Sequence, residues 1–467
     1  MSQLLLHDFL LSVSARHPQR VAAWRHGDSL TFAEVADKTE RMARSLAGAG
    51  LRRSDRLVWW GETDLDLVPL MFATASLGAI FAPVNPSLNE DEAALLLDLA
   101  DPRLVVVDEK HDGQMQLGEL TRATPTTGID SPSVQETDGH IMYFTSGTTG
   151  TPKGIVLSHR TTLLRALPAL GDGPRGPLVS MFPLFHMSGW SSAIGPWLCG
   201  EEVVLADGGD AEVLLRAMEK HRAHRFYGIP AVWRRILDVD LTGYDLTSLK
   251  VADTGTSATT VELLTAIHQA LPQTTTTVTY GSTEASGVCK LPFEDLQRKP
   301  GSVGPPWPGV RVRIEDGQLQ VKSPFLFDGY FRNPAATEAA FVDGWYQTGE
   351  LADMDDEGYV SILGRVSDMI RSGGETISPA EVDAVLLEHP AVVDAAAAGV
   401  ADDDWGEIVT AFLVLRPGAS ITLEELQRHC DKRLARYKTP RRLVLVDSIP
   451  RTGATRQVQR RQLVPKA

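Results

Sequence analysis

The chain has 467 residues, of which 43% are hydrophobic and 22% are charged. This composition is typical of a globular protein and excludes a disordered or fibrous chain. Forty-five Lys and Arg residues against 60 Asp and Glu residues give a net charge of −15. Nucleic-acid-binding domains are usually basic, so this charge argues against nucleic acid as the main partner. The length predicts two or three folding units.

The sequence indicates a cytoplasmic protein with no membrane span. Its three cysteines, Cys199, Cys289 and Cys430, are widely separated, which favours neither a disulfide framework nor a zinc site. No basic stretch precedes an apolar run at the N-terminus, so we expect no signal peptide. The stretch 67–84 is almost uncharged, but it is short for a membrane span of about 20 residues. It predicts a buried helix followed by a strand.

Helix and strand patterns alternate in the first third of the chain. Thr31 and Glu34 have the spacing of a capping box, which predicts a helix that begins after Thr31. Strands alternating with helices predict βαβ units and parallel sheets. The expected elements are a strand at 56–60, a helix from 66, a helix at 92–98 and a strand at 104–108.

The later segments differ in character. Residues 108–137 are polar and predict a linker, and a second series of strands and helices runs from 178 to 278. Alternation at 310–314 and 318–322 predicts half-exposed antiparallel strands. After residue 364 the pattern becomes helix, strand, strand and helix, at 379–388, 391–399, 408–415 and 422–434.

These patterns predict an α/β fold with two domains. Residues 1–364 should form a large N-terminal domain of two βα subdomains plus a small β region. A hinge at 365–367 should lead to a smaller α+β C-terminal domain at 368–467, whose size is normal for one domain.

The segment Tyr143-Phe-Thr-Ser-Gly-Thr-Thr-Gly-Thr-Pro-Lys-Gly154 carries the strongest chemical signal. Its glycines permit tight turns, and its hydroxyl and backbone N–H groups can wrap a phosphate chain beside the charge of Lys153. The segment follows an apolar strand at 141–144, which a flexible linker would rarely do. Its spacing differs from a Walker A loop, in which Lys-Ser/Thr directly follows the last glycine. We interpret it as a phosphate-binding loop.

This loop resembles the phosphate loop of the adenylate-forming (AMP-binding) superfamily, which includes acyl-CoA synthetases, peptide-synthetase adenylation domains and luciferases. The resemblance covers essentially the whole chain. Further matching segments are Tyr280-Gly-Ser-Thr-Glu284, Tyr346-Gln-Thr-Gly-Glu350, Gly364-Arg-Val-Ser-Asp368 and Ser372-Gly-Gly-Glu-Thr-Ile-Ser-Pro379. The resemblance implies that the C-terminal domain is a mobile cap.

The resemblance also implies a nucleotide site. Tyr280 would stack on the adenine, and Glu350, where the family usually has Asp, would bind the ribose hydroxyls together with Arg365. The residues expected to contact ATP or AMP are Thr145, Ser146, Gly147, Thr148, Thr149, Gly150, Lys153, Gly255, Thr256, Ser257, Tyr280, Gly281, Ser282, Thr283, Glu350, Arg365 and Gln457.

Forming an acyl adenylate requires charge neutralisation while a carboxylate attacks the α-phosphate. Glu284 is a candidate Mg²⁺ ligand because hard cations prefer carboxylate oxygen, and Thr148 is its expected partner. Thr283 can donate to the α-phosphate. The expected catalytic residues are Glu284, Thr283, Arg456, Lys153 and His186.

By the same resemblance, two segments line the acid-binding pocket. They are Phe185-His-Met-Ser-Gly-Trp190 and Tyr227-Gly-Ile-Pro-Ala-Val-Trp-Arg-Arg-Ile236, and their aromatic residues imply a size-limited pocket. Arg235 either grips a second carboxylate, as in malonate-activating relatives, or is solvated. The expected pocket residues are His186, Trp190, Tyr227, Trp233, Arg235 and Gly255.

The sequence departs from the family pattern near the C-terminus. The family usually has Pro-Arg-Thr-x-x-Gly-Lys-Ile, whose lysine bridges the attacking carboxylate and the α-phosphate. Here the segment reads Pro450-Arg-Thr-Gly-Ala-Thr-Arg-Gln-Val-Gln-Arg460. Alignment from its start places Arg456 at the lysine position, and alignment from its end places Gln457 there.

The leading functional hypothesis is an ATP- and Mg²⁺-dependent ligase that adenylates a small aromatic or short-chain carboxylic acid and transfers it to CoA. A second hypothesis is an adenylate-forming enzyme with another acceptor. That acceptor would be a carrier protein, or an aromatic amine diazotised with ATP-activated nitrite in secondary metabolism. A third is a non-catalytic homologue that binds a nucleotide. We expect a monomer or homodimer.

Overall fold

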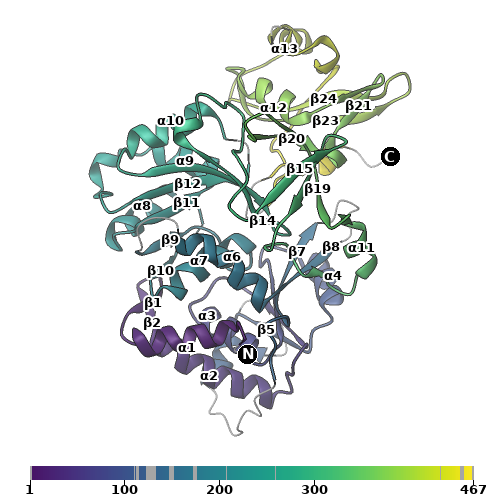
Figure 1. The fold of residues 1–467 in the computed structure, drawn as a ribbon. Helices are drawn as coiled ribbons and strands as arrows, with labels where there is room; N and C mark the ends of the chain where they lie inside the picture. Colours follow the sequence, from purple (N-terminus) through teal and green to yellow (C-terminus); the bar gives the residue numbers. More distant parts are fainter. Residues whose placement is uncertain are drawn as a thin grey trace. The chain divides into compact units, whose positions relative to one another are not determined.

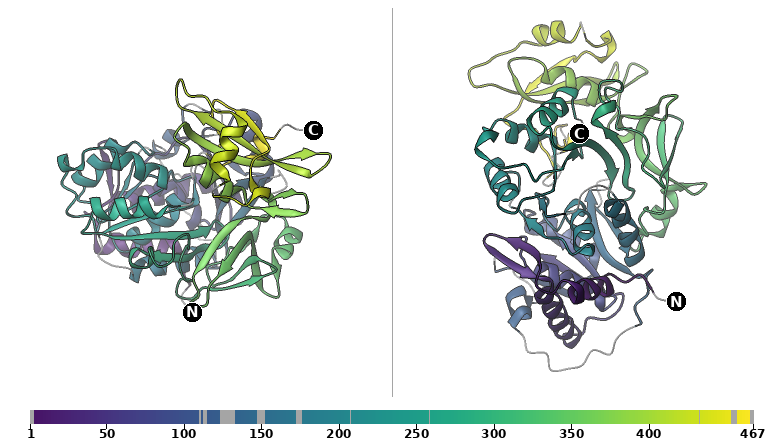
Figure 2. Two further views of the ribbon diagram at one scale, coloured as in Figure 1. Left: turned by 90° about the horizontal axis from the view of Figure 1, so that it is seen from above. Right: turned by 60° about the vertical axis from the view of Figure 1, so that its left-hand side comes forward.

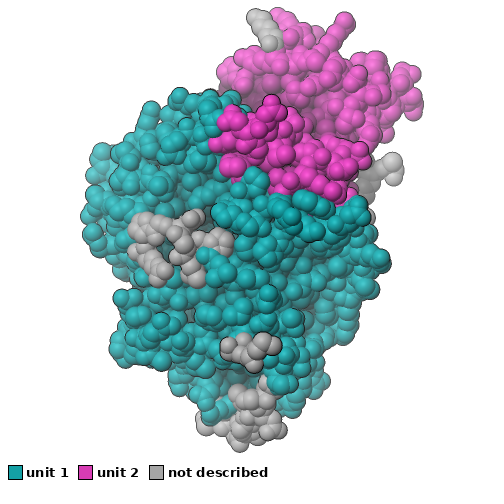
Figure 3. All heavy atoms as spheres, viewed as in Figure 1, with its two compact units in different colours: residues 1–300, 306–311, 322–346 teal, residues 301–305, 312–321, 347–467 magenta. Residues whose placement is uncertain are grey.

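The computed structural model describes residues 3–109, 111, 115–122, 133–146, 152–171, 176–206, 208–257, 259–431, 433–452 and 457–464 (Figure 1). Two compact units make up the chain (Figure 3). Unit 1 comprises residues 1–300, 306–311 and 322–346, and unit 2 comprises residues 301–305, 312–321 and 347–467. The two units are distinguished by the contacts within each of them, and these contacts do not report motion. The hinge expected at 365–367 therefore stays a prediction.

The first sheet of unit 1 has seven strands in the order β17-β8-β7-β4-β3-β5-β6. Helix α3 is buried along nearly its whole length because its sequence, LVPLMFATAS, is almost entirely apolar. The strands are β3 (Arg56–Trp60), β4 (Ile80–Val84), β5 (Leu104–Val107), β6 (Met115–Gln116), β7 (Gly139–Ser146), β8 (Pro152–Ser158) and β17 (Gly329–Tyr330). The helices in this part are α1 (Leu6–Arg16), α2 (Phe32–Gly48), α3 (Leu67–Ser76), α4 (Glu90–Ala100) and α5 (Leu117–Arg122).

The second sheet of unit 1 has eight strands in the order β14-β13-β12-β11-β9-β10-β1-β2. Its strands are β1 (Val21–Arg25), β2 (Asp28–Thr31), β9 (Leu178–Ser180), β10 (Val203–Leu205), β11 (Arg225–Gly228), β12 (Val251–Gly255), β13 (Thr275–Ser282) and β14 (Ser286–Pro292). The helices that follow these strands or connect them are α6 (His159–Gly171), α7 (Met187–Leu198), α8 (Ala211–Lys220), α9 (Pro230–Leu237) and α10 (Val261–Ala270).

Helices separate the two sheets of unit 1. Helix α6 packs on β8 of the first sheet, α7 packs on β9 and β10 of the second, and the two helices pack on each other (Figures 1 and 2). The opposite face of the second sheet packs against α8, α9 and α10, where a cluster of buried side chains includes Phe226, Trp233 and Ala252. One face of this sheet therefore packs on α8 to α10, and the other packs on α7 at β9 and β10.

A five-stranded sheet, most of it in unit 2, has the order β15-β16-β19-β18, with β20 beside β19. Its strands are β15 (Arg311–Glu315), β16 (Gln318–Lys322), β18 (Phe341–Val342), β19 (Trp345–Met354) and β20 (Val360–Arg365), and α11 (Pro334–Ala339) precedes β18. The last sheet has the order β22-β21-β24-β23, with β25 beside β24. It contains β21 (Ile370–Ser372), β22 (Glu375–Ile377), β23 (Val392–Asp402), β24 (Gly406–Leu415) and β25 (Arg442–Leu445), with helices α12 (Pro379–Leu387) and α13 (Leu423–Cys430).

Most of the elements expected from the sequence are present. The capping box is confirmed, since the Glu34 N–H donates to Thr31 Oγ1 at 3.2 Å and the Thr31 N–H donates to Glu34 Oε2 at 2.7 Å. Helix α13 ends at Cys430 and not at the expected Leu434, and the linker expected at 108–137 contains β6 and α5. None of the helices in the described ranges is long and apolar enough to cross a membrane.

Three histidines lie close together: His7 of α1, His140 of β7 and His159 at the start of α6. The ring of His159 lies 5.2 Å from that of His140 and 6.3 Å from that of His7. The backbone N–H of Leu6 donates to His159 Nδ1 at 3.3 Å, so the proton of the neutral ring sits on Nε2, which is buried without a partner among the described residues. Burial lowers the pKa of His159 to about 4, against the opposing charge of Asp138.

This burial predicts a loss of stability in mild acid. The unfolded chain protonates its histidines below a pKa of 6.5, whereas folded His159 stays neutral down to about pH 4. The unfolding free energy should therefore be highest above pH 6.5 and fall as the pH drops toward 4, with roughly 3 kcal/mol of the fall due to His159. Urea unfolding between pH 6.5 and pH 4 measures this fall in the unfolding free energy.

His159→Gln should flatten this pH dependence, since glutamine does not titrate. His26→Gln, which changes an exposed histidine, is the matched control and should leave the slope unchanged. An identical slope in His159→Gln and the wild type would contradict the prediction.

Candidate active site

A lysine, a tyrosine and a glutamate lie next to one another in unit 1. Strand β17 pairs antiparallel with β8, with Tyr330 opposite Ile155. This pairing places Lys153 Nζ 4.6 Å from the centre of the Tyr330 ring. The Tyr330 hydroxyl donates to Glu284 Oε1 at 3.3 Å. Burial, and then the charge of Glu284, raise the pKa of Tyr330, so its hydroxyl stays a neutral donor.

Glu284 lies on the β13–β14 turn, and a buried arginine of α6 holds this turn. Arg165 Nη1 and Nη2 donate to the carbonyls of Thr283 and Glu284 at 3.0 and 2.9 Å, and its Nε donates to the Phe325 carbonyl at 2.8 Å. Burial lowers the pKa of Arg165 to about 10, so the group remains charged at neutral pH. The sequence analysis missed Arg165; its one signal was a charge within the largely apolar stretch TLLRALPAL.

Two glycines beside this turn cannot be replaced by larger residues without displacement of backbone. A Cβ on Gly281 would lie 2.1 Å from the Ser286 carbonyl oxygen. A Cβ on Gly255 would lie 2.1 Å from the Thr279 carbonyl oxygen and 2.4 Å from the Tyr227 hydroxyl. Both glycines were predicted nucleotide contacts, and the close approaches give a structural reason for glycine at each position.

The other predicted contacts of the nucleotide base lie at the same edge of the sheet. Strands β12 and β13 are parallel neighbours, so their carboxyl ends meet, and ligands of α/β sheets commonly bind at such ends. Tyr280 and Ser282 end β13, and the Ser282 hydroxyl accepts the Ala285 N–H at 3.1 Å. Thr256 and Ser257 follow β12, and Thr256 has a left-handed φ of 68°. The structure therefore brings these four residues to one edge.

The predicted phosphate loop connects two paired strands, β7 and β8. Thr145 and Ser146 end β7, and in the antiparallel register they lie opposite Lys153 and Pro152. The loop therefore connects the two sides of a hairpin whose strand β8 carries Lys153. The other predicted loop contacts, Gly147, Thr148, Thr149 and Gly150, lie outside the described residues.

The predicted ribose pair lies in unit 2. Glu350 on β19 faces Arg365 on β20 in the antiparallel register. Arg365 Nε lies 3.6 Å from Glu350 Oε1, and the glutamate side chain is 18% exposed. The two residues that the sequence analysis assigned to one sugar therefore do contact each other.

On the side of the predicted acid pocket, the structure brings Tyr227 and His186 to one aromatic residue. The ring of Phe182 lies 5.5 Å from Tyr227 and stacks on His186 at 6.2 Å. His186 caps α7, with its Nδ1 accepting the Ser188 N–H at 3.1 Å. Burial lowers the pKa of His186 to about 4, so the imidazole is neutral at pH 7. The neutral imidazole can line a pocket or donate a hydrogen bond, but it carries no charge at pH 7.

The surroundings of the three other predicted pocket residues differ from one another. Trp190 is 1% exposed and packs against Phe72, with ring centres 5.8 Å apart. Trp233 is fully buried beside Phe226 in the cluster under α8 to α10, against which Tyr227 also packs. Arg235 is exposed on α9, and its Nε donates to the Ala231 carbonyl at 3.3 Å.

The segment 450–460, in which the sequence predicts that the usual lysine is replaced, is partly described. Arg451 and Val458 form an antiparallel bridge. Between them, the Thr452 N–H donates to the Gln457 carbonyl at 2.8 Å, and the Gln457 N–H donates to Thr452 Oγ1 at 3.0 Å. We call residues 450–452 and 457–460 the C-terminal stem. Arg456 lies outside the described residues.

Two ion pairs hold the C-terminal stem within unit 2. Arg451 Nη2 lies 2.6 Å from Asp394 Oδ1, and Arg460 Nη2 lies 2.5 Å from Asp383 Oδ2. Arg460 Nη1 also donates to the Ala397 carbonyl at 2.8 Å. Both arginines are therefore engaged in structural contacts.

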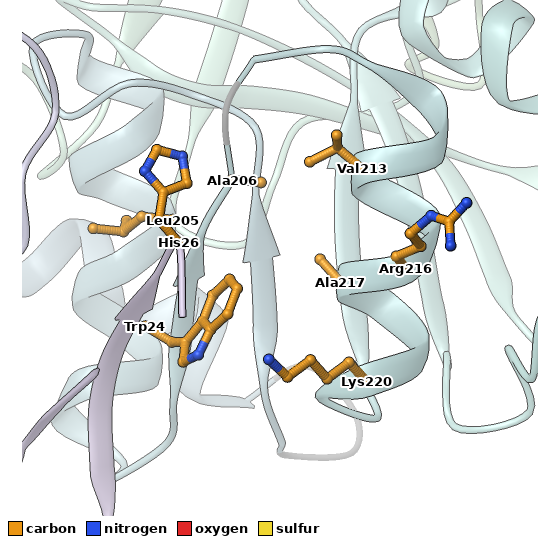
Figure 4. A pocket seen from close by; sticks show the side chains of 8 residues that line it. All are labelled: Trp24, His26, Leu205, Ala206, Val213, Arg216, Ala217 and Lys220. Carbon is orange, nitrogen blue, oxygen red and sulfur yellow. The ribbon is translucent and has the colours of Figure 1, made fainter. Parts of the chain in front are cut away.

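A hollow of about 220 Å³ opens between β1, β10 and α8 (Figure 4). Hydrocarbon side chains such as Leu205 and Ala217 line much of it, and Lys220 Nζ lies 4.5 Å from the centre of the Trp24 ring. None of the predicted site residues lines this hollow, so we do not assign the active site to it.

Comparisons with known proteins agree with this geometry. The family model described as AMP-binding enzyme matches residues 11–331, and the AMP-binding enzyme C-terminal domain matches residues 381–456. A protein of Listeria monocytogenes named 2-succinylbenzoate–CoA ligase is 31% identical over 458 residues, which cover 96% of each chain. A protein of the same name from Bacillus mycoides is 28% identical, with 96% of this chain and 95% of that protein covered.

Solved structures are similar over nearly the whole chain. The o-succinylbenzoate CoA synthetase of Bacillus subtilis, in complex with the acyl-adenylate intermediate, has a TM-score of 0.90 at 29% identity, with 97% of both chains covered. ATP-bound MatB of Rhodopseudomonas palustris has a TM-score of 0.87 at 26% identity, with 99% and 98% covered. The predicted α/β fold with a large N-terminal and a small C-terminal domain is thereby confirmed. The chain belongs to the AMP-binding enzyme family.

Proposed function

We propose that this protein is a ligase that uses ATP and Mg²⁺ to adenylate a small aromatic or short-chain carboxylic acid and then transfers the acyl group to CoA. The observation that carries the proposal is the arrangement of Lys153, Tyr330 and Glu284 around a turn fixed by Arg165. Support comes from the relatives of this chain, which are named as CoA ligases of an aromatic acid and match along nearly its full length.

A divalent metal fits the donors on this turn. Mg²⁺ is usually held by one or two carboxylates plus substrate phosphates, and it needs no all-protein cage. The Glu284 carboxylate is such a donor, and Thr148 is its proposed partner. The related Bacillus subtilis enzyme has been solved with ATP and magnesium ion. When bound, the metal would neutralise phosphate charge.

In the first proposed half-reaction, a carboxylate oxygen of the acid attacks the α-phosphorus of ATP, and the bond to the pyrophosphate oxygen breaks. Lys153 supplies positive charge to the phosphates beside the hydroxyl-rich loop, and Thr283 donates to the α-phosphate. Tyr330 orients the Glu284 carboxylate by its hydrogen bond. Arg165 acts only through the backbone of this turn and is therefore a positioning residue.

In the second proposed half-reaction, the sulfur of CoA attacks the carbonyl carbon of the adenylate, and AMP leaves. Tyr280 and the backbone around Gly255 would hold the adenine, and Glu350 and Arg365 would hold the ribose. Neutral His186, stacked on Phe182, would border the acyl group.

We also propose that Arg456 replaces the missing lysine of the family. The C-terminal stem is consistent with this, because the backbone N–H and carbonyl of Gln457 are both bonded to Thr452. Gln457 carries no charge, so it cannot neutralise the attacking carboxylate. The guanidinium of Arg456 can, although its planar fork differs from an ammonium.

A panel of acids tests the proposed reaction. Pyrophosphate release should require ATP, Mg²⁺ and a small aromatic or short-chain acid, and added CoA should convert the adenylate to an acyl-CoA, identified by mass spectrometry. Turnover of nitrite plus an aromatic amine without any CoA product would contradict the choice of acceptor. Binding of ATP without pyrophosphate release from any acid or nitrite would favour the non-catalytic alternative.

Glu284→Gln should lower kcat for pyrophosphate release by on the order of 10²-fold or more, because a charge needed in the transition state is lost. Glu294→Gln changes an exposed carboxylate in the 3-10 helix that follows β14 and is the matched control. A Glu284→Gln variant with unchanged kcat would show that Glu284 is structural.

Arg456→Ala should slow adenylation by on the order of 10²–10³-fold, the usual cost of losing a positioned charged donor. Gln457→Ala should change the rate little. The readout is pyrophosphate release by the purified variants. Equal rates for Arg456→Ala and the wild type would show that this residue supplies no cation to the reaction.

A further inference from the structure

Two tyrosines lie beside the turn that carries Glu284, and one phenylalanine contacts all three residues. The Phe327 N–H donates to the Glu284 carbonyl at 2.8 Å. The centre of the Phe327 ring lies 4.8 Å from that of Tyr330 and 5.6 Å from that of Tyr346, in edge-on geometry. Phe341, opposite Tyr346 in the pairing of β18 and β19, packs on it at 5.8 Å, and Tyr346 is only 4% exposed. All five residues belong to unit 1, and packing on Phe327 fixes both tyrosines near Glu284.

The side chains of Tyr330 and Tyr346 are hydrogen-bonded to each other through their hydroxyl groups. The Tyr330 hydroxyl also donates to Glu284 Oε1 at 3.3 Å. An ionised carboxylate can only accept, so the single proton of the Tyr330 hydroxyl is used in the bond to Glu284. Tyr346 must therefore be the donor in the bond between the two hydroxyls. In agreement, burial and then the charge of Glu284 raise the pKa of Tyr330, whereas the bond from Tyr346 lowers it, as a donor to a phenol oxygen does.

The three side chains thus form a relay that runs from Tyr346 through Tyr330 to Glu284. Because the Tyr330 oxygen accepts from Tyr346, its own proton is directed toward the carboxylate. Each hydrogen bond in a chain polarises the next, so donation by Tyr346 strengthens the bond that Tyr330 donates. Glu284 is half-buried, and within the described ranges its Oε2 accepts no hydrogen bond. The relay therefore occupies one carboxylate oxygen and leaves the other to bind a metal.

We propose that Tyr346 is a positioning residue for the metal of this site, because it donates to Tyr330 and thereby fixes the Glu284 carboxylate. The inference rests on the proposed function, since it concerns the metal that Glu284 is proposed to bind. Groups that hydrogen-bond a metal ligand orient it, and loss of one such group commonly costs roughly 10–100-fold in metal affinity. Tyr330 is such a group. Tyr346 acts one hydrogen bond further away, so its loss should cost less, about threefold.

Equilibrium binding of a non-reacting nucleotide, α,β-methylene-ATP, tests this proposal by calorimetry. The readout is the Kd in EDTA divided by the Kd in saturating Mg²⁺, a ratio that isolates the contribution of the metal and needs no turnover. Relative to the wild type, Tyr330→Phe should lower this ratio by about tenfold, and Tyr346→Phe should lower it by about threefold. Phenylalanine keeps the ring at position 330, so the contact of Lys153 with that ring can persist. Tyr437→Phe, which changes an exposed tyrosine, is the matched control and should keep the ratio of the wild type.

A double variant, Tyr330→Phe with Tyr346→Phe, separates positioning from a structural role. Tyr346 acts only through Tyr330, so the double variant should have the same ratio as Tyr330→Phe alone, and the two losses should not multiply. Stability should behave differently. Tyr330→Phe removes the acceptor of the buried Tyr346 hydroxyl, whereas the double variant removes both hydroxyls. The free energy of urea unfolding should therefore fall in Tyr330→Phe and recover in the double variant, while the metal-dependent ratio stays low in both.

Equal ratios in the wild type and Tyr346→Phe would overturn the proposal, as would a double variant in which the ratio recovers together with stability. If no acid supports pyrophosphate release, the proposed function fails, and the binding ratios still decide the inference because they need no acid. A wild-type ratio of one, which means that Mg²⁺ does not strengthen nucleotide binding, would overturn both the metal role of Glu284 and the inference.

Discussion

One buried guanidinium fixes the backbone on which the proposed chemistry rests. Arg165 donates to three carbonyl oxygens that belong to two separate segments, the β13–β14 turn and the segment before β17. Because a buried charge is strongly destabilising when its donors lack acceptors, neither segment can shift without loss of these bonds. The position of Glu284 thus depends on the packing of α6 against β8. Tyr330, which follows the second segment, reaches Glu284 for the same reason.

Short-range patterns in the sequence predicted local structure well. The spacing of Thr31 and Glu34 located the start of α2, and the apolar run at 56–60 matched β3 residue for residue. Both signals arise from neighbours in the chain, where hydrogen-bonding rules and alternation apply directly. Motif residues such as Tyr280 and Gly255 were assigned to the nucleotide site by resemblance, and the structure places them near the ends of β13 and β12. Their proximity then follows from the parallel pairing of β12 and β13.

Those patterns could not predict contacts between residues that are far apart in the chain. Arg165 and Tyr330 carry no local signal of their partners, which lie 119 and 46 residues away in the chain. The family resemblance grouped Trp190 with Tyr227 in one pocket. In the structure Trp190 is 1% exposed and packs against Phe72 of α3. Which neighbours a buried side chain meets depends on which helices cover the sheet, and only the folded chain shows that.

The contacts that stabilise the C-terminal stem lie outside the residue that is proposed to act in the reaction. Its two sides are secured by Arg451 with Asp394 and by Arg460 with Asp383, all outside the four residues that connect them. Substitutions at 453–456 therefore leave these ion pairs in place. A change of the cation proposed at position 456 therefore alters none of the four charges in these pairs. Evolution can thus vary the proposed cation while it keeps the ion pairs that secure the stem.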